Sequence, residues 1–315
     1  MMLTSRVRPP CCAAGPVGFG DALPGDSNFS GTNITRLLLA SRQDSIILKP
    51  AHPVFRLDLA LTLNASVGAA PLEIWAAPTL PAAADATLLN DGGCKARRAN
   101  SFVRLQSIDG VAATRGSRWW YVLLATDVGS TELFPRHLHP PPPADGAFVV
   151  HTFGRPCVHG ESTASCLAPF GATTPLLVQT NLTCPDGACR HWELFRVAPV
   201  FQGGWAVVGE IGKYVAVSPQ RLEAVAVDQL RPNATDALSE AELSADADGL
   251  SFNVIGAPGE SVQLTIVSPG NHADGQDSRL ARAMAGSVIV LEAELSSTGR
   301  GRFRCGVVQG GCQMI

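Results

Sequence analysis

The chain has 315 residues, 46% of them hydrophobic and 16% charged, and its formal net charge at pH 7 is −3. This net charge argues against a nucleic-acid partner, because binding to phosphates needs clustered Lys and Arg. There are three lysines, Lys49, Lys95 and Lys213, and the one short basic run, Lys95-Ala-Arg97-Arg98, is typical of a solvated loop. The sequence contains no run of about 18 apolar residues, so we expect no membrane span. This length allows one large domain or two modest ones.

The first 27 residues are interrupted by Pro and Gly, and we expect residues 1–27 to form a disordered tail. A secretory signal has a basic patch, an apolar run and a small-residue cleavage site, and this segment does not fit that pattern. Either the natural N-terminus lies upstream of Met1, or the start of the gene is assigned incorrectly. In both cases we expect the chain to be part of a longer protein.

Alternating hydrophobic residues predict β-strands along most of the chain. From Phe55 to Leu63 every second residue is Phe or Leu, which is the period of two that buries one face of a sheet. Further strands are predicted at Leu72–Ala76, Ser101–Gln106, Arg118–Asp127, Ala147–Phe153, His191–Ala198, Gly204–Ser218, Leu222–Asp228, Leu250–Ile255, Ser261–Ser268 and Ser287–Leu295. One helix-like segment, Ala237–Ala247, is short. We therefore predict an all-β fold of antiparallel sheets packed as sandwiches.

Two β units are expected. A polar stretch that begins near residue 231 separates a larger antiparallel β domain, residues 28–230, from a small C-terminal β unit, residues 231–315. Asp248-Gly249 is predicted to form a hairpin turn, and Ala257-Pro258-Gly259-Glu260 another. A disulfide is expected to close the last hairpin.

Five of the nine asparagines lie in the pattern Asn-x-Ser/Thr, where chance predicts about one. They are Asn28, Asn33, Asn64, Asn181 and Asn233. This sequon is the acceptor for N-glycosylation in the secretory pathway. The sequence therefore predicts a secreted glycoprotein or one that resides in another secretory compartment.

The spacing of the cysteines also indicates a protein of an oxidising compartment, in which disulfides form. Short intervals flanked by turn residues predict disulfide-stapled turns. The pairs are Cys157 with Cys166, Cys184 with Cys189, and Cys305 with Cys312. Zinc is the alternative, but no CxxC occurs and Cys184…Cys189-Arg-His191 lacks a second ligand pair at zinc-finger spacing.

Motifs that carry catalysis are missing: there is no G-x-S-x-G, P-loop, G-x-G-x-x-G or H-E-x-x-H. His159-Gly-Glu161 lacks the downstream P-C-x-x-C of a zinc deaminase. A calcium-like loop at Ser244–Gly249 has Ile255 where a bidentate Glu is needed. His137 and His139 are expected to be solvated. We therefore predict no catalytic residue, no metal site and no cofactor in this chain.

All five tryptophans lie in predicted strands, and sugar-binding β-modules stack rings on such side chains. Adjacent residues of a strand point to opposite faces, so we expect one of Trp119 and Trp120 in the core and the other outward. Both are candidates for a sugar contact, with Trp120 as the exposed example.

The segment from Ala198 to Arg221 resembles a stretch near the C-terminus of melibiase-like α-galactosidases of plants and algae, and Gly256–Glu260 extends the resemblance. The matching residues are Ala198-Pro199-Val200, Trp205, Val207-Val208-Gly209-Glu210, Lys213-Tyr214-Val215, Val217-Ser218 and Arg221. Between them we predict two strands kinked at Gly209–Gly212, with Glu210 and Lys213 as a surface ion pair at a β-bulge. A contact with a neighbouring domain is the alternative role for this pair.

Those enzymes have a (β/α)₈ catalytic barrel followed by antiparallel β-sandwiches. This chain has neither the nucleophile context of that family nor an alternating βα pattern, so the resemblance implies the accessory region without the catalytic one. Its expected partners are a missing N-terminal catalytic domain of the same protein and carbohydrate. The alternatives are a free-standing extracellular carbohydrate-binding or adhesion module, and a structural wall glycoprotein.

Overall fold

A computed structural model describes residues 38–51, 53–57, 73–81, 119–126, 130–139, 141–179, 192–228, 249–270, 279–306 and 311–315. Within these residues the fold is all-β, as predicted, and every pairing between strands is antiparallel. The predicted tail, the strand Ser101–Gln106 and the helix Ala237–Ala247 lie outside the described residues.

The largest sheet has six strands in the order β1-β2-β3-β8-β5-β6. Its strands are β1 (Phe55–Arg56), β2 (Glu73–Pro81), β3 (Trp119–Thr126), β5 (Phe148–Thr152), β6 (Leu167–Phe170) and β8 (Trp192–Pro199). One face of this sheet is covered by the pair β4 (Thr131–Leu133) and β7 (Leu176–Val178). Large hydrophobic residues are buried on both faces of this sheet, for example Trp120 on one and Phe195 on the other, which accounts for the apolar runs in β3 and β8. Trp192, at the start of β8, is exposed.

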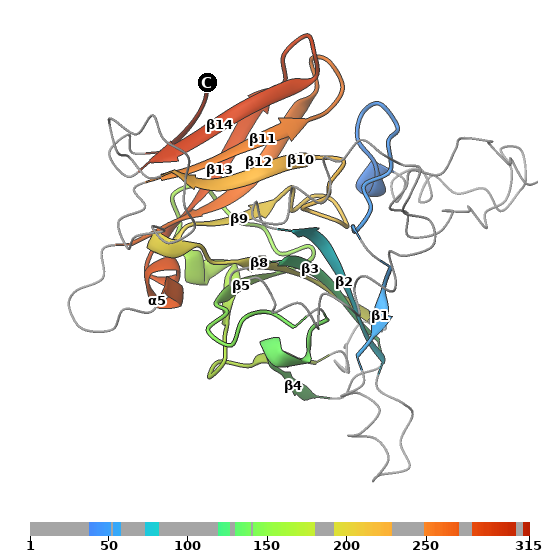
Figure 1. Cartoon of the computed structure of the whole chain (residues 1–315), viewed down its shortest axis with the longest axis vertical. Helices are drawn as coiled ribbons and strands as arrows, with labels where there is room; N and C mark the ends of the chain where they lie inside the picture. Colours follow the sequence, from blue (N-terminus) through green and yellow to red (C-terminus); the bar gives the residue numbers. More distant parts are fainter. Residues whose placement is uncertain are drawn as a thin grey trace, which may run out of the picture.

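Two smaller sheets stack above the six-stranded sheet (Figure 1). One has the order β13-β12-β9 and the other β10-β11-β14-β15. The strands are β9 (Ala206–Gly209), β10 (Leu222–Asp228), β11 (Gly249–Ile255), β12 (Ser261–Ser268), β13 (Ser287–Glu294), β14 (Arg300–Gly306) and β15 (Gly311–Met314). Short helices η2 (Pro135–His137), η3 (Thr163–Ser165), η4 (Gln202–Gly204) and α5 (Arg279–Met284) lie in the connections.

In strand β14 the residues alternate between buried and exposed, with the period of two of a β-strand. Gly301, Phe303 and Cys305 are buried, whereas Arg300 and Arg302 between and beside them are exposed. The alternation turns the apolar side chains of β14 inward. There Phe303 stacks on Phe252 of β11 at a centroid distance of 5.4 Å. A single cluster of buried residues contains side chains from all three large sheets.

The expected boundary between residues 230 and 231 lies between strands that pair with each other. β10 precedes the boundary and pairs with β11 after it, and β9 pairs with β12 in the same way. Strands on the two sides of this boundary therefore share two sheets and contribute to one hydrophobic cluster.

Three local predictions need correction. The sequence predicts two strands in Gly204–Ser218, kinked at Gly209–Gly212, but only Ala206–Gly209 is strand. Gly204 belongs to η4, and residues 211–217 form a turn followed by a bend. The turn at Ala257–Glu260 is present, with the Glu260 N–H donating to the Ala257 carbonyl at 3.0 Å. It is not a hairpin turn, however, because it connects β11 of one sheet to β12 of the other. Gly249 likewise begins β11 instead of forming a turn.

Candidate functional site

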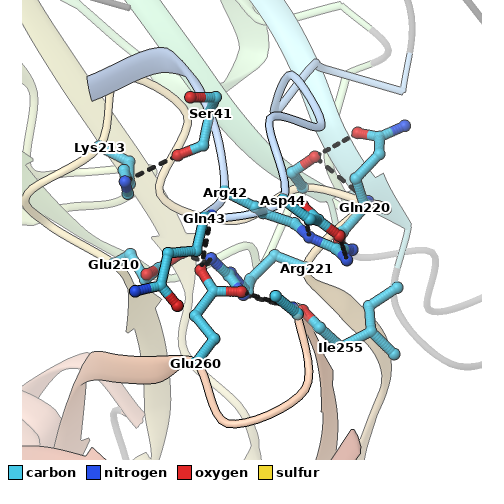
Figure 2. A network of polar contacts seen from close by, with 12 residues as sticks. Ser41, Arg42, Gln43, Asp44, Glu210, Lys213, Gln220, Arg221, Ile255 and Glu260 are labelled. Carbon is cyan, nitrogen blue, oxygen red and sulfur yellow. Dashed lines mark hydrogen bonds and ion pairs between the residues drawn. The ribbon is translucent and has the colours of Figure 1, made fainter. Parts of the chain in front are cut away.

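Three segments that are distant in the sequence meet beside the two upper sheets: residues 38–49, the connection from Glu210 to Arg221, and the turn before β12 (Figure 2). Gly209 lets the middle connection fold back, because its φ is +88° and a Cβ there would lie 2.2 Å from the Ala216 carbonyl oxygen. Only glycine fits such a position without strain. The reversal places Glu210 opposite Arg221, which immediately precedes β10.

Arg221 is the centre of this ion-pair network, and its side chain is completely buried. Its Nε donates to Glu210 Oε2 at 2.6 Å. On its other side Nη2 donates to Glu260 Oε1 at 2.6 Å and Nη1 to Glu260 Oε2 at 3.1 Å, which forms a bidentate pair. Nη1 also donates to the Ile255 carbonyl at 2.9 Å. One guanidinium thus links the β9–β10 connection with the β11–β12 turn, as Figure 2 shows.

The two carboxylates have different environments. Burial opposes ionisation of Glu260, but the hydrogen bonds from Arg221 and from the main-chain N–H groups of Ala257 and Gln43 outweigh it and lower its pKa to about 2. Burial raises the pKa of Glu210, and the single bond from Arg221 does not reverse that effect. The same carboxylates hold the pKa of Arg221 above its usual value despite its burial.

Residues 38–49 are fastened to this network by Lys213 and Arg42. Lys213 Nζ donates to the carbonyl oxygens of Leu38 and Ser41 at 2.8 and 2.7 Å. Arg42 pairs with Asp44 and donates to the Gln220 carbonyl at 2.6 Å. The predicted surface pair of Glu210 and Lys213 is therefore wrong: Glu210 is 7% exposed and bonds Arg221, because the backbone reversal turns its side chain into the core.

The network contains one carboxylate with a raised pKa, Glu210, and one with a lowered pKa, Glu260. Glycosidases use such a difference for their acid and their nucleophile. Here, however, both carboxylates bind the same arginine, and they are only 7% and 4% exposed. A substrate oxygen has no access to either group. The contacts of these carboxylates hold three segments of the chain together, because Arg221 joins the connection from Glu210 to the turn before β12 and the Gln43 N–H donates to Glu260.

A second cluster, the aromatic cluster, consists of Phe153, Trp192 and Tyr214. Phe153 lies after β5, and its ring centroid is 6.3 Å from that of Trp192 and 5.3 Å from that of Tyr214, at interplanar angles of 34° and 36°. Trp192 is 37% exposed and the other two are half-buried. Below this surface, the Arg196 guanidinium lies 4.8 Å from the centre of the Phe153 ring.

The tryptophans named as sugar contacts lie elsewhere. Trp120 is 2% exposed and its indole N–H bonds the Val207 carbonyl, so it is the core residue of the pair and its prediction as an exposed sugar contact is wrong. Trp119 is half-buried and packs against the second hydrophobic cluster. The strand alternation was correct, but it does not say which face is covered by another sheet.

Two of the three predicted disulfides are confirmed. Cys157 bonds Cys166 with a Cα separation of 5.3 Å, and Cys305 bonds Cys312 with one of 3.9 Å. Both are compatible with a protein of the secretory pathway or the extracellular space. Cys184 and Cys189 lie outside the described residues. All five sequon asparagines, Asn28, Asn33, Asn64, Asn181 and Asn233, lie outside them as well.

The remaining motifs have ordinary surroundings. His137 Nδ1 accepts the Phe134 N–H at 3.1 Å, and His139 makes an edge contact with Phe55 at a centroid distance of 5.4 Å. The described residues hold no group of three or more His, Cys, Asp or Glu side chains placed to bind a metal. Their helices are also too short or too polar for any of them to cross a membrane.

The comparisons with known proteins add nothing to this geometry: no family model matches the chain, and no curated protein or solved structure matches it significantly. The buried cations Arg196 and Arg221 were not predicted from the sequence. A signal existed for Arg196, because it interrupts the apolar run from Leu194 to Val200. Arg221 lies in the turn just before β10 and has no comparable local signal.

Proposed function

We propose that this chain is the non-catalytic β-sandwich region of a secreted glycoside hydrolase similar to the melibiase-like α-galactosidases. In that role it packs against a catalytic barrel and helps to hold it in shape. The fold class and both disulfides are consistent with this role. The sequons outside the described residues supply the glycosylation that such a secreted protein carries.

The observation that carries the proposal is the convergence of the resembling residues. Glu210, Arg221 and Glu260 come from two separate resembling segments, and they bond one another in a buried network. If the resembling residues were unrelated surface residues, we would not expect three of them to bond one another in a buried network. These residues instead define the folded unit whose sandwich architecture the resemblance implies.

Sequencing of full-length transcripts tests the assignment. We expect an in-frame segment upstream that encodes alternating β-strands and helices with paired Asp residues. A secreted form of that longer protein should lose mass on peptide N-glycosidase treatment. A transcript that encodes only a signal peptide before residue 28 would exclude the accessory role and leave the binding-module role.

A second candidate is a carbohydrate-binding module, and the aromatic cluster favours it. A partly exposed tryptophan beside two further rings offers flat apolar surface for the C–H face of a sugar. Isothermal titration of the purified chain with galactose-containing oligosaccharides tests this role. Binding that disappears in Trp192→Ala and persists in Trp119→Ala would support it, whereas no binding to the unaltered chain would exclude it for those sugars.

A further inference from the structure

Arg196 of β8 is a buried cation among neutral partners. Only 2% of the surface of Arg196 is exposed to solvent. Nη1 lies 2.9 Å from His151 Nδ1, and Nη2 donates to the Lys213 carbonyl. His151 Nε2 lies 2.7 Å from the Arg155 carbonyl, so Nε2 carries the proton and Nδ1 accepts from Arg196. The imidazole is therefore neutral, and burial together with the nearby positive charge of Arg196 lowers its pKa to about 4.

The positive charge of Arg196 is not balanced within the described part of the chain. No carboxylate there pairs with Arg196, whereas Arg221 holds two. The ring of Phe153 contributes its π face only. A buried charge without a counter-charge is unfavourable, and burial lowers the pKa of Arg196 to about 9. A group of opposite charge beside the guanidinium would stabilise its charged form.

A small cavity adjoins the guanidinium. Its volume is about 10 Å³, and its lining includes Arg196 and Val197 of β8, Thr79 of β2, Trp120 of β3 and Val208 of β9. This volume admits one particle about the size of a water molecule. The cavity lies where the six-stranded sheet meets β9, and every residue of its lining except Val122 is buried.

Two polar atoms of the residues that line this cavity have no hydrogen-bond partner: Arg196 Nε and Thr79 Oγ1. Thr79 is 1% exposed and stands at a β-bulge, where the register of β2 against β3 passes from Pro78 to Leu80. Bulges redirect a side chain from the regular alternation. The Trp120 indole N–H is already used, since it donates to the Val207 carbonyl.

We propose that this cavity is a binding site for one monatomic anion of halide size, with chloride as the first candidate. The N–H of Arg196 and the O–H of Thr79 donate to it, and its charge balances the guanidinium. A water molecule fits the same volume and accepts the same hydrogen bonds, but it leaves the charge unbalanced. Sulfate and phosphate, with five heavy atoms each, are too large for this space.

Thermal unfolding of the full chain tests the site. We expect the melting temperature to rise with chloride or bromide and then saturate, at an ionic strength held constant with sodium gluconate. Binding to the folded state alone produces such a rise. Thr79→Val keeps the shape and removes one donor, so it should raise the half-saturating chloride concentration about tenfold. Arg196→Met should abolish the dependence.

Arg302→Met is the matched control, because Arg302 is an exposed arginine of β14 far from the cavity residues in sequence and sheet. It should keep the chloride response of the unaltered chain. Salts also stabilise proteins non-specifically, so the decisive comparison is between variants in the same salt. Should Arg196→Met fail to fold, Thr79→Val still decides the matter.

Crystals grown in bromide supply the direct readout. An anomalous peak between Thr79 and Arg196 is expected. Ordinary water density at that position without anomalous signal would overturn the proposal. So would equal melting temperatures in chloride and gluconate for the unaltered chain, or an unchanged chloride response in Thr79→Val.

Discussion

The indole N–H of Trp120 donates to the main-chain carbonyl oxygen of Val207 at 2.7 Å. The two residues belong to β3 and β9, so this bond joins the six-stranded sheet to the three-stranded sheet above it. The ring of Trp120 also lies against Phe201, at a centroid distance of 5.7 Å. The contact between these sheets therefore depends on a directional bond as well as on apolar packing.

Replacing Trp120 by Phe is expected to lower the free energy of unfolding by about 2–4 kcal/mol, because it removes the bond to a buried carbonyl and leaves unfilled volume. Urea denaturation at pH 7 measures the change. Trp192→Phe is the matched control, since the exposed Trp192 should change stability by less than about 0.5 kcal/mol. Equal effects of the two substitutions would contradict the role assigned to Trp120.

Regular strands followed from the sequence where alternation ended at clear turn residues. The strands Leu222–Asp228 and Ser261–Ser268 have the bounds that their hydrophobic pattern predicts. The prediction failed between Glu210 and Ser218, where hydrophobic residues continue but the chain folds back at Gly209. There a polar network with Arg221 decides the backbone path, and β-propensity does not.

The candidate site was harder to predict than the strands. Glu210 and Glu260 are 50 positions apart in the sequence, and no local sequence pattern predicts that both bind one arginine. The short strands β4 and β7 were also missed, because three residues are too few to show a period of two. Both kinds of feature depend on tertiary contacts between distant segments.

Acid should weaken the fold through Glu260. Its pKa is lowered to about 2 in the folded chain, so its contribution is fully present above the unfolded value near 4.5 and is lost as the pH falls from about 4.5 toward 2. Glu210 acts in the opposite direction, because burial raises its pKa and protonation in the folded state then becomes more favourable.

We therefore expect Glu260→Gln to lose most of the decline in unfolding free energy between pH 4.5 and pH 2. At pH 7 the same substitution should cost about 3–5 kcal/mol, because it breaks a buried bidentate pair. Glu294→Gln, which changes an exposed carboxylate of β13, is the control and should keep the acid decline. An unchanged pH profile in Glu260→Gln would show that another group causes the acid dependence.

Lys213 should control the attachment of residues 38–49. Lys213→Met removes the two bonds from Nζ to the carbonyl oxygens of Leu38 and Ser41. Amide hydrogens in this segment, such as that of Leu48, which bonds the Ala40 carbonyl, should then exchange about tenfold faster. Hydrogen–deuterium exchange with mass spectrometry measures this rate.

Lys49→Met is the matched control, because the contacts of Lys49 in the network are made by its main chain. Its N–H donates to Gln220 Oε1 at 3.1 Å and its carbonyl accepts from Ser218 at 2.9 Å. Exchange in residues 38–49 should therefore stay unchanged in this variant. Equal acceleration in both variants would mean that charge, not the Lys213 contact, holds the segment.

The chain alone should not hydrolyse glycosides. Hydrolysis requires two carboxylates that face a substrate, one ionised and one protonated. Glu210 and Glu260 are the pair whose pKa values move apart, but Arg221 occupies the space between them and both are buried. The purified chain should therefore release no nitrophenol from aryl α-galactosides at any pH between 4 and 7. Turnover that disappears in Glu210→Gln, with the melting temperature preserved, would show that this network is catalytic and that its role is more than structural.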